Sequence, residues 1–158
     1  MKRGRILNKD LNEVIASMGH GDLLIVCDAG FPIPNSVRRI DLALEKDTPD
    51  LLYVLSLLKE DFIVERVAVA TEMEEFNPPL FNAIRHLFPE ATLETIPHEK
   101  ILTEMPYRAK AIVRTGAFNP WGNILLYSGV DVPRWFDKEG VKVPPYYEER
   151  MRQLKGQG

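Results

Sequence analysis

The pattern of hydrophobic and polar positions alternates between helical and strand-like segments. Near the start of the chain, apolar residues recur at helical spacing: Leu11, Val14, Ile15 and Met18. Gly19 is well placed to end that helix. Thr48-Pro49 and Asn77-Pro78 each combine an N-capping residue with a proline suited to the first helical position, so each predicts a helix start. Pro89 is expected to close the second of these helices.

Short runs of apolar and β-branched residues predict strands between these helices. The predicted strands are 23–27, 64–70, 92–96, 111–115 and 124–128. The first of them, LLIVC, is continuously apolar, which is typical of a strand covered on both faces. Residues 71–75, TEMEE, are interpreted as a solvated acidic loop. Strands separated by helices predict a three-layer α/β/α domain with a largely parallel central sheet.

Composition narrows the class of protein. The chain has 158 residues, 45% of them hydrophobic and 27% charged, as expected for one soluble globular domain. Its net charge of −3 argues against general nucleic-acid binding, which usually needs a basic face. No apolar run approaches the roughly 20 residues of a membrane helix, and no secretory signal follows the basic start. A single cysteine forms no internal disulfide, so we expect a cytoplasmic protein.

The composition changes after Val132, where the chain becomes rich in aromatic, proline and charged residues. We therefore divide it into a domain over residues 1–132 and a C-terminal extension over 133–158. The extension is expected to pack on the same or a neighbouring subunit. Alternatively, it acts as a lid or specificity element that brings Trp135, Tyr146 or Tyr147 to a site.

The stretch GHGDLLIVCDAG, residues 19–30, holds the main candidates for chemistry. Asp28 follows the strand 23–27, at the carboxyl end where ligands bind in open α/β sheets, but a turn or capping aspartate also fits there. His20 precedes the same strand and is either a solvated turn residue or an acid–base catalyst. The strand would separate the two by about 20 Å, too far for one small substrate within one subunit. Cys27 is interpreted as a small buried hydrophobe.

Several motifs with known chemistry are missing. The sequence has no G-x-G-x-x-G or P-loop motif, so it predicts no dinucleotide or nucleotide cofactor. It has no G-x-S-x-G elbow for acyl transfer and no H-E-x-x-H or paired-cysteine spacing for a metal. We therefore expect no cofactor and no metal, and any chemistry should be acid–base work by imidazole and carboxylate groups.

The chain resembles the RbsD/FucU family of sugar mutarotases from Met1 to about Val132. The motifs that carry the resemblance are KRGRILN, MGHGDLLIVCDAGFPIP, RIDLAL, FNPPL, PHEK and AIVRTGAFNPWGNILLYSGV. Gly30 after Asp28-Ala29 is similar to the ribose-acting branch of the family. The resemblance implies an isomerase that interconverts the pyranose and furanose forms of D-ribose, without a cofactor.

The resemblance also implies roles for individual residues. His20 matches the family's catalytic proton donor, and Asp28 and His98 match its sugar-binding positions. Trp121-Gly122-Asn123 matches a sugar-contacting segment that usually begins with tyrosine. The family's site lies between subunits of a ring-shaped homo-oligomer, often a decamer of two pentamers, and such a site would remove the distance objection.

Alternatives remain open at the level of sequence. His98 also fits a helix cap, and Asn123 fits an ordinary loop before a strand. Trp121 donates one hydrogen bond but accepts none, so it either weakens a tyrosine-dependent step or stacks on a sugar face. The substrate is then D-ribose or another monosaccharide such as L-fucose. The remaining alternative is a non-catalytic sugar-binding accessory protein that uses the same pocket.

Overall fold

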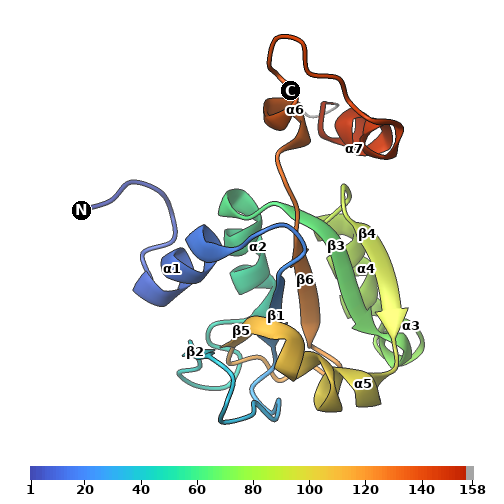
Figure 1. Cartoon of the computed structure of the whole chain (residues 1–158). Helices are drawn as coiled ribbons and strands as arrows, with labels where there is room; N and C mark the ends of the chain where they lie inside the picture. The colour runs from blue at the N-terminus through green and yellow to red at the C-terminus, as the bar shows by residue number, and fades with distance from the viewer. Residues whose placement is uncertain (156–158) are drawn as a thin grey trace.

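A computed structural model describes residues 1–155 and shows a six-stranded mixed sheet with helices on both faces (Figure 1). The strands are β1 (Leu23–Cys27), β2 (Arg39–Asp41), β3 (Val64–Ala70), β4 (Thr92–Ile96), β5 (Ala109–Arg114) and β6 (Ile124–Ser128). The helices are α1 (Lys9–Ser17), α2 (Leu51–Asp61), α3 (Thr71–Phe76), α4 (Pro78–Leu87), α5 (His98–Thr103), the 3₁₀ helix η1 (Met105–Arg108), α6 (Val132–Trp135) and α7 (Pro145–Lys155).

The strand order is β2-β5-β1-β6-β3-β4. β5 pairs in parallel with β1 and β2, and β3 pairs in parallel with β4. β6 lies between β1 and β3 and is antiparallel to both. The N-terminal ends of β1 and β3 therefore lie at the same edge of the sheet, next to the C-terminal end of β6. The α/β prediction is confirmed, with one strand reversed.

The core follows from the apolar strands at the centre of the sheet. All five residues of β1 are buried, which explains its continuous hydrophobic run because helices cover both of its faces. Cys27 is fully buried and behaves as the small hydrophobe that the sequence predicted. Burial raises the pKa of its thiol far above the ordinary range, so this cysteine is chemically inert.

Four local predictions need correction. The second helix begins after Pro49, because the side chain of Asp50 is its N-cap and accepts from the Leu52 N–H at 3.0 Å. The acidic segment 71–75 belongs to the short helix α3, which buries Met73 against the core. β5 spans 109–114 where the sequence indicated 111–115. The edge strand β2 was not predicted, since it has three residues and buries only its central one.

The C-terminal extension leaves the sheet after β6. Figure 1 shows α6 and α7 beyond the end of the sheet where β1 and β3 begin. Arg150 of α7 ties the extension to the domain of its own chain, donating hydrogen bonds to the carbonyl oxygens of Val64, at 3.1 Å, and Glu90. The last three residues of the predicted extension, 156–158, lie outside the described residues.

Candidate active site

The loop after β1 holds Asp28 in a fixed position. One carboxylate oxygen of Asp28 accepts the Gly30 N–H at 2.8 Å, which closes a tight turn at the carboxyl end of the strand. The backbone N–H of Asp28 donates to Oδ1 of Asn123 at 3.3 Å. Asn123 is 2% exposed and directly precedes β6. The resemblance placed both residues in one sugar site, and the fold brings them into contact.

A cavity of about 500 Å³ opens beside Asp28. Its walls include Asp28, Gly30, Arg114, Phe118, Asn119 and Pro120. This volume is within the range of small-molecule sites, and its walls combine apolar surface with a few polar groups. The cavity can therefore hold a monosaccharide with Asp28 at its edge.

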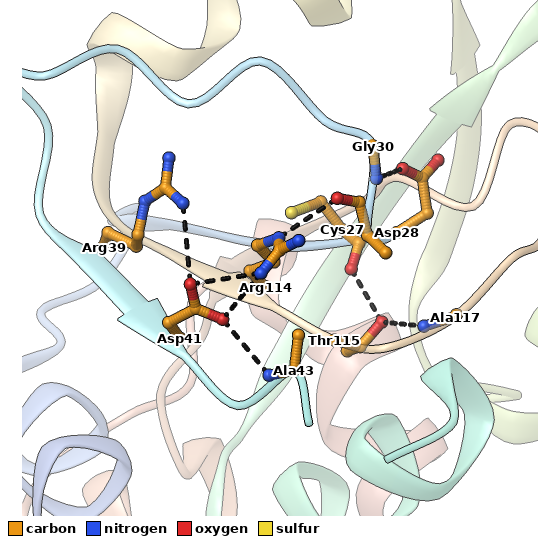
Figure 2. A network of polar contacts seen from close by, with 10 residues as sticks. Cys27, Asp28, Gly30, Arg39, Asp41, Ala43, Arg114, Thr115 and Ala117 are labelled. Carbon is orange, nitrogen blue, oxygen red and sulfur yellow. Dashed lines mark hydrogen bonds and ion pairs between the residues drawn. The ribbon is translucent and has the colours of Figure 1, made fainter. Parts of the chain in front are cut away.

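Arg114 supports this cavity through a polar network (Figure 2). Its Nε donates to the carbonyl oxygen of Ala29 at 3.0 Å, and its Nη1 lies 3.2 Å from both carboxylate oxygens of Asp41. Partial burial raises the pKa of Asp41, but hydrogen bonds from the Ala43 N–H and from Arg114 outweigh it and hold that pKa below its usual range. The network fixes the loop after β1. Sequence reasoning missed Arg114, although it lies within a predicted strand, 111–115, and ends β5 in the structure.

His98 lies near Asp28 at the start of α5. Its backbone N–H donates to Oε2 of Glu72 at 3.1 Å, and within the described part of the chain its buried Nδ1 has no hydrogen-bond partner. Burial raises the pKa of Asp28, although the Gly30 N–H, the Asn123 side chain and the nearby His98 each act to lower it. Burial therefore disfavours the charged form of Asp28, and these neighbours offset that effect only in part.

The loop before β6 has a constrained shape. Trp121 has a φ of 57°, in the left-handed region, and its ring stacks on Phe76 with centroids 5.6 Å apart. A Cβ on Gly122 would lie 2.7 Å from the carbonyl oxygen of Asn119, so a glycine is needed there. The Asn123 N–H donates to the Trp121 carbonyl oxygen at 2.8 Å. This turn places the side chain of Asn123 where its Oδ1 accepts the hydrogen bond from the Asp28 N–H.

His20 lies at the opposite end of β1. The turn around it is held by the Gly21 N–H, which donates to the Ser128 carbonyl oxygen at 2.8 Å, and Gly21 adopts a φ of 83°. The Nε2 of His20 is 2.9 Å from both carboxylate oxygens of Glu65, at the start of β3. Because a carboxylate only accepts, this contact favours the tautomer that carries its proton on Nε2 and leaves Nδ1 as an acceptor. Sequence reasoning missed Glu65.

The structure therefore divides the predicted residues into two groups. Asp28, His98 and Asn123 meet at the carboxyl end of β1, with Trp121 and Gly122 in the adjoining loop. His20 and its partner Glu65 lie at the amino end of the same strand, in a separate cavity of about 480 Å³. Within one chain, the length of β1 keeps the two groups about 20 Å apart.

Comparison with known proteins identifies the family. The sequence pattern of the RbsD / FucU transport protein family matches residues 1–131. The chain belongs to the RbsD / FucU family. This member is 57% identical over 150 residues to D-ribose pyranase 2 of Rubrobacter xylanophilus, covering 95% of this chain and 97% of the relative. It is 50% identical over 151 residues to D-ribose pyranase 1 of Streptomyces griseus, covering 96% of this chain and all of the relative.

A solved structure shows the same fold for another RbsD / FucU protein. Bacillus subtilis RbsD complexed with D-ribose superposes with a TM-score of 0.78 at 36% identity, covering 82% of this chain and 98% of that protein. The alignments to the Rubrobacter and Streptomyces relatives are long enough to continue past residue 131, into the extension that the family pattern does not cover.

Two other features are absent from the described residues: a cluster of metal ligands and a membrane-spanning helix. Residues 1–155 contain no cluster of three or more histidine, cysteine, aspartate or glutamate side chains arranged to hold a metal ion. Over the same residues, every helix is too short or too polar to cross a membrane.

Proposed function

We propose that this protein is a D-ribose pyranase, an isomerase that interconverts the pyranose and furanose forms of D-ribose. The observation that carries the proposal is a 57% identity over nearly the whole length of a relative named D-ribose pyranase. The B. subtilis relative of known structure was solved with D-ribose bound, which supports a monosaccharide as the ligand. The single cysteine of the chain is free and buried, which agrees with the cytoplasmic location that we propose.

The reaction needs proton transfer alone. Opening the hemiacetal requires a base that removes the proton of the anomeric hydroxyl and an acid that protonates the ring oxygen. The resulting aldehyde then closes through a different hydroxyl, with the two proton roles reversed. No electron or group is transferred, so the reaction calls for no cofactor. Positioned acid–base groups typically contribute about 10²–10⁴-fold to such a step.

We assign the proton transfer to His20. Histidine suits this role because an imidazole side chain can both give and accept protons near neutral pH. The hydrogen bonds to Glu65 direct Nε2 toward the protein and leave Nδ1 as the nitrogen that exchanges a proton with the sugar.

We assign sugar binding to Asp28, His98, Trp121, Gly122 and Asn123. Asp28 lines the cavity, and its carboxylate can accept hydrogen bonds from sugar hydroxyls there. His98 lies close enough to Asp28 for their charges to interact, which supports its place in the same sugar site. Trp121 takes the place of the family's tyrosine and offers an aromatic surface, one side of which is packed on Phe76.

The active site is proposed to form between two copies of the chain. Because β1 separates the two groups, the His20 end of one copy must meet the Asp28 end of the next. Such head-to-tail contacts between unlike surfaces generate a closed ring when the rotation closes. A pentamer, or a decamer of two pentamers, meets this requirement.

One experiment tests the reaction and the shared site together. Exchange NMR of D-ribose measures the pyranose–furanose interconversion with wild type, His20→Ala and Asp28→Asn. We expect faster exchange with wild type only. Unaccelerated exchange with ribose and with a sugar panel including L-fucose would instead identify a sugar-binding protein.

A mixture of the two inactive variants, assembled together, tests whether copies share sites. If each site takes His20 from one copy and Asp28 from its neighbour, random mixing restores about a quarter of the sites. A mixture that stays inactive would place both residues in one chain and contradict the shared site.

A further inference from the structure

The C-terminal helix α7 lies against the His20 end of the sheet. Arg150 of this helix donates to the carbonyl oxygens of Val64 and Glu90, so it bridges β3 and the segment before β4. Its guanidinium lies close enough to Glu65 for the two charges to interact. The helix is therefore anchored next to the carboxylate that holds His20.

Tyr147 lies on the same face of α7 as Arg150, since three residues are close to one helical turn. Its ring is tilted by 40° to the imidazole of His20, with the centroids 6.5 Å apart. Phe136 and Tyr146 pack on Tyr147 with centroids at 5.7 and 4.9 Å, which restricts its movement. His20 is thus contacted by Glu65 at Nε2 and by an aromatic ring from the extension.

The same helix completes the cavity around His20. The sheet contributes Glu65, Arg66 and Thr92 to its walls, and α7 contributes Tyr147, Arg150 and Gln153. The family pattern ends at residue 131, so this wall is an addition to the family's shared domain. Relatives that align over 150 residues or more carry sequence at the corresponding positions.

We propose that Tyr147 is a positioning residue for His20 and that α7 forms, within the same chain, one wall of the catalytic half of the site. This inference rests on the proposed function. Glu65 fixes which nitrogen of His20 faces the protein, and Tyr147 limits rotation of the ring. Removing the tyrosine ring should lower kcat, because misplacement of a catalytic group slows the reaction. It should leave KM unchanged, because the sugar-binding groups of that site belong to a neighbouring copy and are not altered by the substitution.

The test compares Tyr147→Ala, Tyr147→Phe and Trp135→Ala by ribose exchange NMR. Trp135 is the matched control, since it belongs to the same extension, is 57% exposed and does not line the cavity. We expect Tyr147→Ala to lower kcat about tenfold, a fraction of the 10²–10⁴-fold that acid–base catalysis supplies. Tyr147→Phe should keep the wild-type kcat because the aromatic ring is retained. Trp135→Ala should also have the wild-type kcat.

Two results would overturn the inference while leaving the proposed function intact. One is a wild-type kcat in Tyr147→Ala, and the other is an equal loss in Tyr147→Ala and Trp135→Ala. Should the alanine variant fail to fold, Tyr147→Leu keeps apolar bulk without the ring and is expected to show the same fall in kcat. Failure of the wild type itself to accelerate exchange would overturn the proposed function.

Discussion

The hydrogen bonds between Glu65 and His20 give the sharpest prediction. Glu65→Gln keeps the side-chain length and one acceptor oxygen but removes the charge. In the native chain both carboxylate oxygens lie 2.9 Å from Nε2, so the proton stays on that nitrogen. The glutamine amide can also donate to Nε2, which stabilises the opposite tautomer and places the proton on the nitrogen meant for the sugar.

The expected fall in kcat depends on how far solvent reaches the side chains of His20 and Glu65. A hydrogen bond to a charged group contributes about 1.5–3 kcal/mol. The side chains of His20 and Glu65 are 39% and 29% exposed, so solvent weakens their contact and the lower end applies. About 1.4 kcal/mol is a factor of ten in rate, so kcat should fall about tenfold in Glu65→Gln. KM should stay near the wild-type value because the Asp28 group is untouched.

Exchange NMR over a series of ribose concentrations separates kcat from KM. Glu60→Gln is the control, since Glu60 is in an exposed ion pair with Arg5 at the end of α2. A wild-type kcat in Glu65→Gln would refute the orienting role of this carboxylate. A change confined to KM would also refute it, because it would make Glu65 a sugar ligand.

Three further predictions concern the surroundings of the two groups. Gly129→Ala should lower kcat, because the added Cβ would lie 2.9 Å from Cβ of Glu65 and 3.1 Å from its Oε2, and it should be measured by the same exchange assay. Gly122→Ala should destabilise the fold by about 1–3 kcal/mol in denaturant unfolding, because its Cβ would lie 2.7 Å from a backbone carbonyl oxygen. Asp41→Asn should cost about 1 kcal/mol at neutral pH, because the partly exposed ion pair with Arg114 is lost. The folded-state pKa of Asp41 is depressed, so its stabilisation is present above the ordinary value of 3.8 and is lost as pH falls through the folded pKa. The unfolding curves of variant and wild type should therefore converge at acid pH.

Each of these three predictions would be contradicted by a specific result. Full activity in Gly129→Ala would mean that Glu65 moves without consequence. Wild-type stability in Gly122→Ala would show that the loop relaxes freely. For Asp41→Asn, a stability difference that stays constant down to acid pH would rule out the charge as its source.

Much of the fold can be predicted because its central strands are buried on both faces. Short runs rich in apolar and β-branched residues, such as 23–27 and 124–127, favour buried strands, and they lie in β1 and β6. The edge strand β2 was not predicted, because only its central residue is buried and it therefore has no apolar run in the sequence. The helix start at Asp50 was misplaced because Thr48-Pro49 carries the same local signal without forming the cap.

The site was predictable in part for a related reason. The position of Asp28 at the carboxyl end of β1 was predicted correctly, because the end of an apolar strand is visible in the sequence. Glu65 was not, because its contact with His20 depends on the strand order β1-β6-β3, which brings the starts of two parallel strands together across a third. Arg114 depends likewise on the register that sets it beside Cys27. Such partners follow from sheet topology and leave no local pattern.

The reversed strand β6 has a particular place in this arrangement. Its beginning follows Asn123, whose side chain accepts from the Asp28 backbone, and its end at Ser128 accepts from the turn that carries His20. Because β6 is buried and paired on both sides, it fixes the separation of the two groups within each copy. In the shared site that we propose, each copy would supply both ends at once, so their separation would have to be constant. β6, the strand that departs from an all-parallel sheet, would then be the element that holds the two ends of each copy at a fixed distance.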